Sequence, residues 1–481
     1  MSTLSSPLES RPALAPEPGH SRYVWRICLV AAMGGLLFGY DWVVVGGAKP
    51  FFEKFFQLNS GALSGWANSC ALLGCLLGSL VSGGLSDRLG RKRLLIASAV
   101  LFGITSVLTG WAPNFHWFVV WRILGGVAIG MASNLSPIYI AEVAPAHQRG
   151  KLVAINQLTI VFGVLGAQIA NWLIAQKMPD NASAEFIRQS WNGQFGWRWM
   201  FTAVAAPSLF FFLGALFLPE SPRWLVKNGM ADRARKVLAR IGGEQYAAAE
   251  VRDIEETISS EQVRHVRYRD LLEPRMLRIL WIGVFLAVLQ QWSGLNIIFN
   301  YAEEIYREAG YGVNDILFNI VITGTINMVF TFLAVGTVDR CGRRLLMLTG
   351  CAGIAVSHLL LGFAYLAGLK GFAVLVITLS AMAFYAMSLA PIVWVLISEL
   401  FPNRIRGAAV SVAVSALWIS CFILTYTFPL LRAAVGLTVA FWLYGAFCVL
   451  GFIVVLLRVP ETKGKSLEQI ERELTSPNHT S

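Results

Sequence analysis

The sequence predicts an all-α membrane protein whose twelve spanning helices form two six-helix halves joined by a helical linker. Three observations lead to this prediction. Of the 481 residues, 56% are hydrophobic and 14% are charged, whereas a soluble domain has roughly 25% charged residues. Long apolar runs recur along the chain, and charged motifs of the first half return in the second. With so few polar groups to form a surface, much of the protein must be covered by lipid.

The apolar runs set the expected helices, because a spanning helix needs about 20 apolar residues. They predict helices near 25–47, 62–85, 94–112, 116–140, 150–175, 197–218, 277–300, 316–338, 345–367, 371–397, 405–428 and 435–457. Residues 1–23 are rich in Pro, Ser and Ala, and we expect a disordered tail there. The N-terminal half is then 24–218, the C-terminal half 277–457, and the C-terminal tail 458–481.

Residues 219–276 make the one long connection. Apolar and charged residues alternate there at helical spacing, most clearly at 231–238 and 251–258. This pattern predicts two or three short amphipathic helices on the cytoplasmic face.

Lysine and arginine set the expected orientation. They gather in the tails, in the linker and in the loops on one side, whereas the opposite loops hold only Lys49, Lys54, Lys177, Arg188, Arg198, Arg307, Lys370 and Arg432. Both termini should therefore be cytoplasmic, in a plasma membrane. No targeting segment is apparent, which fits a bacterial inner membrane. The net charge of +11 follows this topology and does not indicate nucleic-acid binding.

An internal repeat indicates how the helices are organised. Asp-Arg-Leu-Gly-Arg at 87–91 returns as Asp-Arg-Cys-Gly-Arg at 339–343, and the Glu, Pro, Arg and Gly of 142–150 return at identical spacing in 399–407. Two parallel halves of this kind place a substrate site between them at mid-membrane. Opposite charges at the cytoplasmic helix ends would pair while one gate is shut and separate as the halves rock. The alternative is topology control by positive charge alone.

Several motifs together resemble the sugar-porter branch of the major facilitator superfamily. They are Pro-Glu-Ser-Pro-Arg-Trp-Leu at 219–225, Pro-Glu-Thr-Lys-Gly-Lys-Ser-Leu at 460–467, Gln-Gln-Trp-Ser-Gly-Leu-Asn at 290–296 and Trp-Arg-Ile-Leu-Gly-Gly at 121–126. The resemblance covers about 24–471. It implies the major facilitator fold and alternating access for a monosaccharide, hexose or pentose, or a similar polyol. We expect a functional monomer in a lipid bilayer, with no cofactor and no metal.

The expected substrate site combines amides with aromatic rings. Amides donate and accept hydrogen bonds, as sugar hydroxyls do, and a neutral polyol needs no counter-charge. The resemblance implies that sugar contacts Phe38, Gln157, Gln290, Gln291, Asn296, Asn327, Trp394 and Trp418. It assigns the extracellular gate to Asn300 and Tyr301. For each amide, the alternative is an interhelical hydrogen bond.

The expected cytoplasmic gate is made of charged residues from the repeated motifs and from the ends of the halves. They are Asp87, Arg91, Glu142, Arg149, Glu220, Arg223, Asp339, Arg343, Glu399, Arg406 and Glu461.

This chain departs from the family pattern within the expected site. Asn300 stands where a second Tyr beside Tyr301 is usual, and Val164 is apolar where some members have Gln. Leu417 and Cys421 flank Trp418 where amides are common, and Ala390 replaces a frequent Gly. These changes reduce hydrogen bonding on one side of the site.

Asp41 and Arg122 are the expected proton-coupling pair, because they are the clear intramembrane charges. An isolated carboxylate within the bilayer costs at least ~2.5–3.5 kcal/mol, so Asp41 should have a partner or a proton. Proton-coupled members of the family resemble this chain at both positions. We expect ionised Asp41 to pair with Arg122 and protonation to break the pair. A purely structural ion pair is the alternative.

Other functions remain open at this stage. The nearest is a facilitative uniporter of the same sugars, followed by a carrier of a cyclic polyol such as inositol or of an organic acid, and by a sugar sensor. A drug exporter does not suit the amides at 290–296, and no nucleotide-binding loop, metal cluster or catalytic triad indicates an enzyme.

Overall fold

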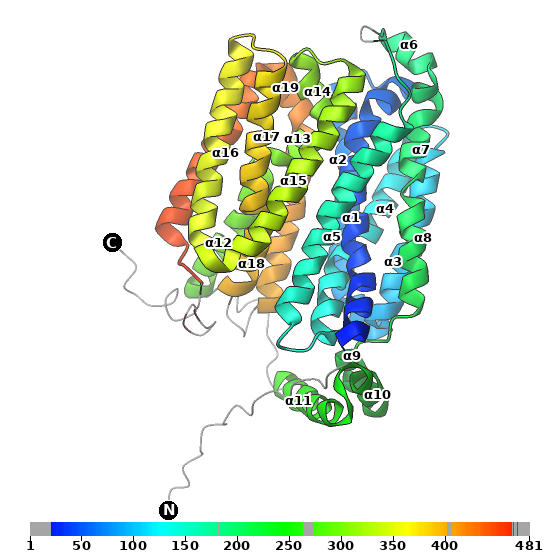
Figure 1. Cartoon of the computed structure of the whole chain (residues 1–481), viewed down its shortest axis with the longest axis vertical. Coiled ribbons are helices and arrows are strands. Elements are labelled where there is room, and N and C mark those ends of the chain that lie inside the picture. Colours follow the sequence, from blue (N-terminus) through cyan, green and yellow to red (C-terminus); the bar gives the residue numbers. More distant parts are fainter. Residues whose placement is uncertain are drawn as a thin grey trace, which may run out of the picture.

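The computed structural model describes residues 21–179, 182–262, 273–401, 406–463, 465 and 469. Their regular elements are helices (Figure 1). The expected tail 1–23 and the C-terminal tail therefore lie largely outside the described residues.

The first half contains α1 (Ser21–Phe55), α2 (Gly61–Leu89), α3 (Arg91–Gly110), α4 (Phe115–Val143), α5 (Arg149–Ile174), α6 (Ala184–Gln189), the π-helical turn η1 (Asn192–Gly196), α7 (Trp197–Thr202) and α8 (Ala205–Leu216). Three helices follow it, namely α9 (Pro222–Lys227), α10 (Ala231–Gly242) and α11 (Glu244–Gln262). The second half contains α12 (Pro274–Trp292), α13 (Leu295–Asn300), α14 (Ala302–Glu308), α15 (Val313–Cys341), α16 (Arg343–Leu366), α17 (Phe372–Met387), α18 (Leu389–Leu400) and α19 (Arg406–Arg458). The halves stand side by side, and α9–α11 lie below one end of the bundle, which we call the linker end; the opposite end is the distal end (Figure 1).

The number of membrane crossings follows from helix length. Eleven segments of the described chain are long and apolar enough to span a bilayer, and the last of them has 51 residues, Ala408–Arg458. A straight helix of that length would measure about 75 Å, against a hydrocarbon core of about 30 Å. Gly436, with φ 73° and ψ 173°, interrupts it and divides it into two crossings. The prediction of twelve spanning helices in two halves is confirmed.

Two expected helices are broken near their middle. The helix expected at 277–300 is α12 and α13, separated at Gly294 with φ 81°. The helix expected at 371–397 is α17 and α18, which meet at Ser388 with φ −132° and ψ −89°. A break frees backbone carbonyls from the helical ladder, so that side chains of neighbouring helices can bind them.

The sequence repeat has a structural counterpart at the linker end. Gly90 and Gly342 precede α3 and α16 with φ 93° and 89°, which glycine adopts without strain. The Glu220 carboxylate accepts hydrogen bonds from the backbone N–H groups of Arg91 and Lys92. Glu461 accepts the equivalent bonds from Arg343 and Arg344. In each half, the segment that follows the last helix thus supplies a carboxylate to a helix N-terminus, where the helix dipole favours negative charge.

Removing one of these carboxylates should destabilise the C-terminal half. Burial alone would raise the pKa of Glu461, but backbone N–H groups that include those of Lys463, Arg343 and Arg344 lower the pKa overall. The stabilisation is therefore complete above the ordinary pKa of about 4.3 and is lost as the pH falls through the lower folded value. We expect Glu461→Ala to lower the free energy of unfolding by about 0.5–2 kcal/mol at pH 7.

Thermal unfolding in detergent measures this cost. The variant should melt below the wild type at pH 7, and the gap should shrink in acid. Glu244→Gln, which changes an exposed linker carboxylate, is the control. Equal melting temperatures of Glu461→Ala and wild type at pH 7 would contradict the prediction.

The halves approach each other closely at the distal end. A Cβ atom on Gly46 of α1 would lie 2.3 Å from the carbonyl oxygen of Phe299 in α13. A Cβ on Gly65 of α2 would lie 2.3 Å from the carbonyl oxygen of Tyr426 in α19. Both glycines therefore allow backbone contact between the halves, which closes this end.

Lys49 and Lys54 were expected in a loop, and both placements are wrong, because α1 continues to Phe55 and contains both residues. Lys49 has 2% of its surface exposed. The apolar run ends near 47, yet the helix continues because carboxylates of both halves pair with the Lys49 ammonium.

Candidate functional site: a buried ion pair and a small cavity between two halves

Asp41 and Arg122 form a buried ion pair between α1 and α4. Arg122 Nη1 lies 2.7 Å from Asp41 Oδ1 and 2.8 Å from Oδ2, and each residue is 5% exposed. The Phe201 ring packs on the guanidinium, with 5.4 Å from Cζ to the ring centroid. Among the described residues, Arg122 Nε has no hydrogen-bond partner. A neutral Asp41 would leave Arg122 as a buried, unpaired charge, so the protonation state of Asp41 changes the energy of the site strongly.

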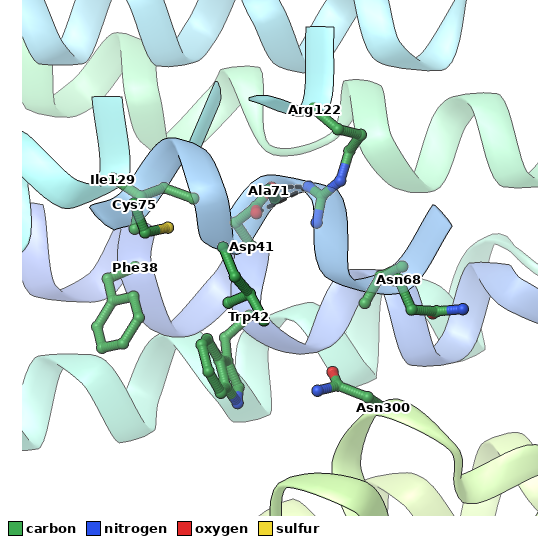
Figure 2. A pocket seen from close by; sticks show the side chains of 11 residues that line it. Phe38, Asp41, Trp42, Asn68, Ala71, Cys75, Arg122, Ile129 and Asn300 are labelled. Carbon is green, nitrogen blue, oxygen red and sulfur yellow. Dashed lines mark hydrogen bonds and ion pairs between the residues drawn. The ribbon is translucent and has the colours of Figure 1, made fainter. Parts of the chain in front are cut away.

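The ion pair faces a small cavity between the halves (Figure 2). The cavity has a volume of about 20 Å³. Its lining comes from α1, α2, α4 and α13, namely Phe38, Asp41, Trp42, Val45, Asn68, Ala71, Leu72, Cys75, Arg122, Ile129 and Asn300. A water molecule needs about 10–15 Å³ measured in this way, so the space suits one water and is too small for a sugar ring. A sugar would require the lining to separate.

Asn300 is the contribution of the second half to this cavity. It lines the cavity together with Trp42 and is 4% exposed. Its Oδ1 and the Oδ1 of Asn68 have no hydrogen-bond partner in the part of the chain that the structure describes. Buried amide oxygens without partners are costly, so both are available to a hydroxyl or a water that enters.

An aromatic cluster forms the wall beside Asp41. The Phe38 ring lies 5.6 Å from Trp42 and 5.8 Å from Trp418, and the two indoles lie 6.2 Å apart. Phe38 and Trp42 belong to α1, whereas Trp418 belongs to α19, so the cluster bridges the halves. Such rings offer flat faces to the C–H surface of a sugar.

The amides of the broken α12–α13 helix are buried beside one another. Gln290 Nε2 donates to the carbonyl oxygens of Leu389 and Ala390, at 3.1 and 3.0 Å, at the start of α18. Asn296 Nδ2 donates to Gln291 Oε1, and Gln291 Nε2 lies 3.4 Å from Gln290 Oε1. In this conformation Gln290 therefore makes the interhelical bonds that were the alternative to sugar contact, whereas Gln291 and Asn296 satisfy each other.

Of the residues expected at the substrate site, only Phe38 lines the cavity. Trp418 packs on Phe38, the amides of Gln290, Gln291 and Asn296 lie at the α12–α13 break, and the other three lie elsewhere. Asn327 is buried in α15, Gln157 is half-buried in α5, and Trp394 of α18 is 38% exposed. Tyr301, expected at a gate, donates its hydroxyl to the Thr425 carbonyl oxygen at 2.6 Å and packs on Phe428.

Among the cavity residues that were not predicted from the sequence, Trp42 and Asn68 are the two that offer a hydrogen-bonding group on a ring or an amide. Trp42 directly follows Asp41, so its position beside an expected buried charge could have indicated a place in the site. Asn68 is a polar residue inside an apolar helix, and a search for amides in α2 would have found it.

The charged residues at the linker end pair within each half. Arg91 Nε lies 3.1 Å from Glu142 Oε2, and Arg91 Nη1 lies 3.1 Å from Asp87 Oδ1. In the second half, Arg343 Nη2 lies 3.5 Å from Glu399 Oε1. These pairs brace helices of a single half in this conformation.

Four gate candidates remain, and the structure describes the side chains of two of them. Arg149 is exposed at the start of α5, and Arg223 is half-buried in α9. The side chains of Asp339 and Arg406 lie outside the described residues.

The fold and the site define a class of protein. Two six-helix halves enclose a buried ion pair, unpartnered amides and aromatic rings at their contact, which is the arrangement of an alternating-access membrane carrier.

The comparisons with known proteins agree with this class. The profile of the family described as "Sugar (and other) transporter" matches residues 27–474. The chain belongs to this family, the sugar porters of the major facilitator superfamily. It is 37% identical to the D-xylose-proton symporter of Escherichia coli K12, over 94% of this chain and 96% of the relative. It is 38% identical to a glucose transport protein of a Synechocystis strain, over 93% of this chain and 97% of the relative.

A solved structure agrees as well. The inward-open conformation of the E. coli xylose transporter XylE superposes with a TM-score of 0.81 and 36% identity, covering 94% of this chain and 100% of that one.

Proposed function

We propose that this protein couples the uptake of a monosaccharide to the entry of a proton, by alternating access. The observation that carries the proposal is the Asp41–Arg122 pair, which is buried next to a cavity shared by both halves. A carboxylate at that position can exchange a proton only when the cavity opens to one side. The names of the relatives, a D-xylose-proton symporter and a glucose transport protein, support a sugar as the substrate.

The geometry suggests how the two ligands depend on each other. Ionised Asp41 holds Arg122 and therefore ties α1 to α4. Protonation removes this attraction and leaves the two helices free to shift. Because Phe38 and Trp42 of α1 also form the aromatic wall, such a shift changes the space available to sugar. Gln291, Asn296 and Asn300 supply the amides that would bind its hydroxyls.

The same proposal includes an orientation. Arginine and lysine concentrate at the linker end, so this end faces the cytoplasm and the distal end faces outward. Both termini are then cytoplasmic, in a bacterial inner membrane, and one chain suffices for transport because each chain contains both halves and the cavity between them.

Reconstitution into liposomes tests the function. Labelled pentoses, hexoses and inositols are offered with and without an inward proton gradient. Accumulation above equilibrium that needs the gradient supports symport. Uptake that only equilibrates and ignores the gradient makes the protein a facilitative uniporter, and uptake of inositol alone makes it a polyol carrier.

Removing one amide of the α12–α13 break should weaken sugar binding. Gln291→Ala deletes the Gln291 amide and also releases Asn296 from its hydrogen bond. Each neutral hydrogen bond contributes about 1 kcal/mol, so the loss of one or two such bonds should raise the KM for sugar about 5- to 30-fold. Initial uptake rates across a range of sugar concentrations measure the change.

Gln176→Ala is the matched control, because Gln176 is an exposed residue beyond the end of α5. It should transport as the wild type does. An unchanged KM in Gln291→Ala would assign Gln291 to structure and remove it from the site.

A further inference from the structure

A second group of buried charges lies at the distal end, apart from the Asp41–Arg122 pair. Lys49 of α1 forms ion pairs with Glu53 of the same helix and with Glu303 and Glu304 of α14. Lys49 Nζ lies 3.2 Å from Glu53 Oε2 and 3.8 Å from Glu303 Oε2, and it donates a short hydrogen bond to Glu304 Oε1. The group joins the two halves directly beside the close backbone contact of Gly46 with Phe299.

The other groups that face these charges are few. The Ser64 hydroxyl of α2 donates to Glu53 Oε1 at 2.5 Å, and Arg307 Nη2 lies 2.5 Å from Glu303 Oε1. Lys49 Nζ also lies 5.4 Å from the centroid of the Tyr301 ring. The described residues around Lys49 therefore contain three carboxylates and two cations, of which Arg307 is 45% exposed.

This balance leaves one buried negative charge without compensation. Lys49, Glu303 and Glu304 are 2%, 5% and 9% exposed. An uncompensated charge in such surroundings is costly, and a carboxyl group avoids the cost by taking up a proton. One carboxyl of the group should therefore be neutral while the halves are in contact.

Glu304 is the carboxyl that fits this role. Its Oε1 accepts from Lys49, but its Oε2 is buried with no hydrogen-bond partner in the described chain. Both oxygens of Glu53 and both oxygens of Glu303 lie near a donor or a cation. Burial raises the pKa of Glu304, which lies beyond the end of the span Met276–Asn300, although Lys49 opposes this effect.

We propose that Glu304 is a second proton-binding site, which holds a proton while the distal end is closed and releases it when α1 and α14 separate. Opening exposes the carboxyl to water, where it ionises as an ordinary glutamate does. Closure therefore takes up one proton from the distal side. This role goes beyond the proposed symport and does not depend on the function of Asp41.

The sign of the pH dependence follows from linkage. The closed state binds the proton more tightly, so the ratio of closed to open protein rises as the pH falls from the closed-state pKa toward about 4.3. For a single proton the ratio changes at most about tenfold per pH unit. Above the closed-state pKa, and below about 4.3, it should be constant.

The closed fraction can be measured as a distance between spin labels on the two halves. Cysteines replace Asn59 and Lys370, which are exposed positions at the distal ends of the first and second halves. Cys341→Ser removes the exposed native thiol, since the other cysteines are buried. Asp41→Asn is present throughout, so that titration of Asp41 does not contribute.

In this background, the closed fraction should rise in acid. Glu304→Gln copies the protonated carboxyl and should remain closed at every pH. Glu53→Gln removes the surplus charge in another way and should also lose the pH dependence, which keeps the test valid if one variant fails to fold. Glu185→Gln, an exposed carboxylate of α6, is the control and should keep the full dependence.

Three outcomes would overturn the proposal. They are a pH dependence that persists in Glu304→Gln, a closed fraction that is already independent of pH in the parent protein, and a Glu304→Gln variant that stays open at every pH.

Discussion

Asp41→Asn should abolish proton-driven accumulation of sugar while it preserves exchange of sugar across the membrane. At ~100 mV, one proton contributes ~2.3 kcal/mol, which supports roughly fifty-fold accumulation at one proton per sugar. Asparagine has the shape of the neutral acid and still accepts a hydrogen bond from Arg122, but it cannot carry a proton. The accumulation ratio should therefore fall from about fifty to about one.

Proteoliposomes with and without an inward proton gradient give the ratio, and counterflow exchange shows that the variant is folded. Asp232→Asn, in the exposed part of α10, makes the same chemical change away from the cavity and should accumulate sugar normally. If Asp41→Asn accumulates sugar as the wild type does, Asp41 does not couple the proton. If neither protein accumulates sugar but both exchange it, the protein is a uniporter and the ion pair is structural.

Gly46→Val should stall the carrier with its distal end open. The added Cβ would lie 2.3 Å from the Phe299 carbonyl oxygen, which is closer than atoms can pack, so the two backbones can no longer meet. Overpacking of this kind costs about 1–3 kcal/mol, which shifts the closed-to-open ratio about 5- to 150-fold. Net uptake should fall by a similar factor, because each cycle requires closure.

Cys75 reports the open state without any added residue, because it lines the cavity and is 2% exposed. A membrane-impermeant thiol reagent on the distal side should label Cys75 faster in Gly46→Val than in the wild type, as read by peptide mass spectrometry. Gly83→Val is the control, since a Cβ there meets nothing within 4 Å. Normal uptake in Gly46→Val would show that the Gly46 contact is not needed for closure.

Much of the fold could be predicted because lipid imposes simple rules. Apolar length determines the crossings, and the repeated Asp87 and Glu142 motifs reveal the two halves. The contact of Asp41 with Arg122 could also be predicted, since a charge within a bilayer needs a partner and these two were the clear candidates.

The parts that could not be predicted depend on packing between helices. Lys49 looked like a loop residue because its partners Glu303 and Glu304 lie some 250 positions away in the sequence. A sequence does not show that Gln290 turns toward the carbonyls freed at Ser388, because it does not show that the helix breaks there. The sequence also does not show which of Trp42 and Trp394 lines the cavity, since an indole in a membrane helix packs on lipid, on other helices or on a cavity.

The two carboxylates at the linker end define where each half of this chain ends. Glu220 follows α8 and binds the start of α3, and Glu461 follows α19 and binds the start of α16. Each half is thus complete only with the short peptide beyond its last crossing. A piece of this chain that is to fold as one half must therefore include six crossings together with this peptide. A chain divided after α11 would keep Glu220 with the first half, whereas a chain divided at Leu218 would separate Glu220 from the helix that it binds.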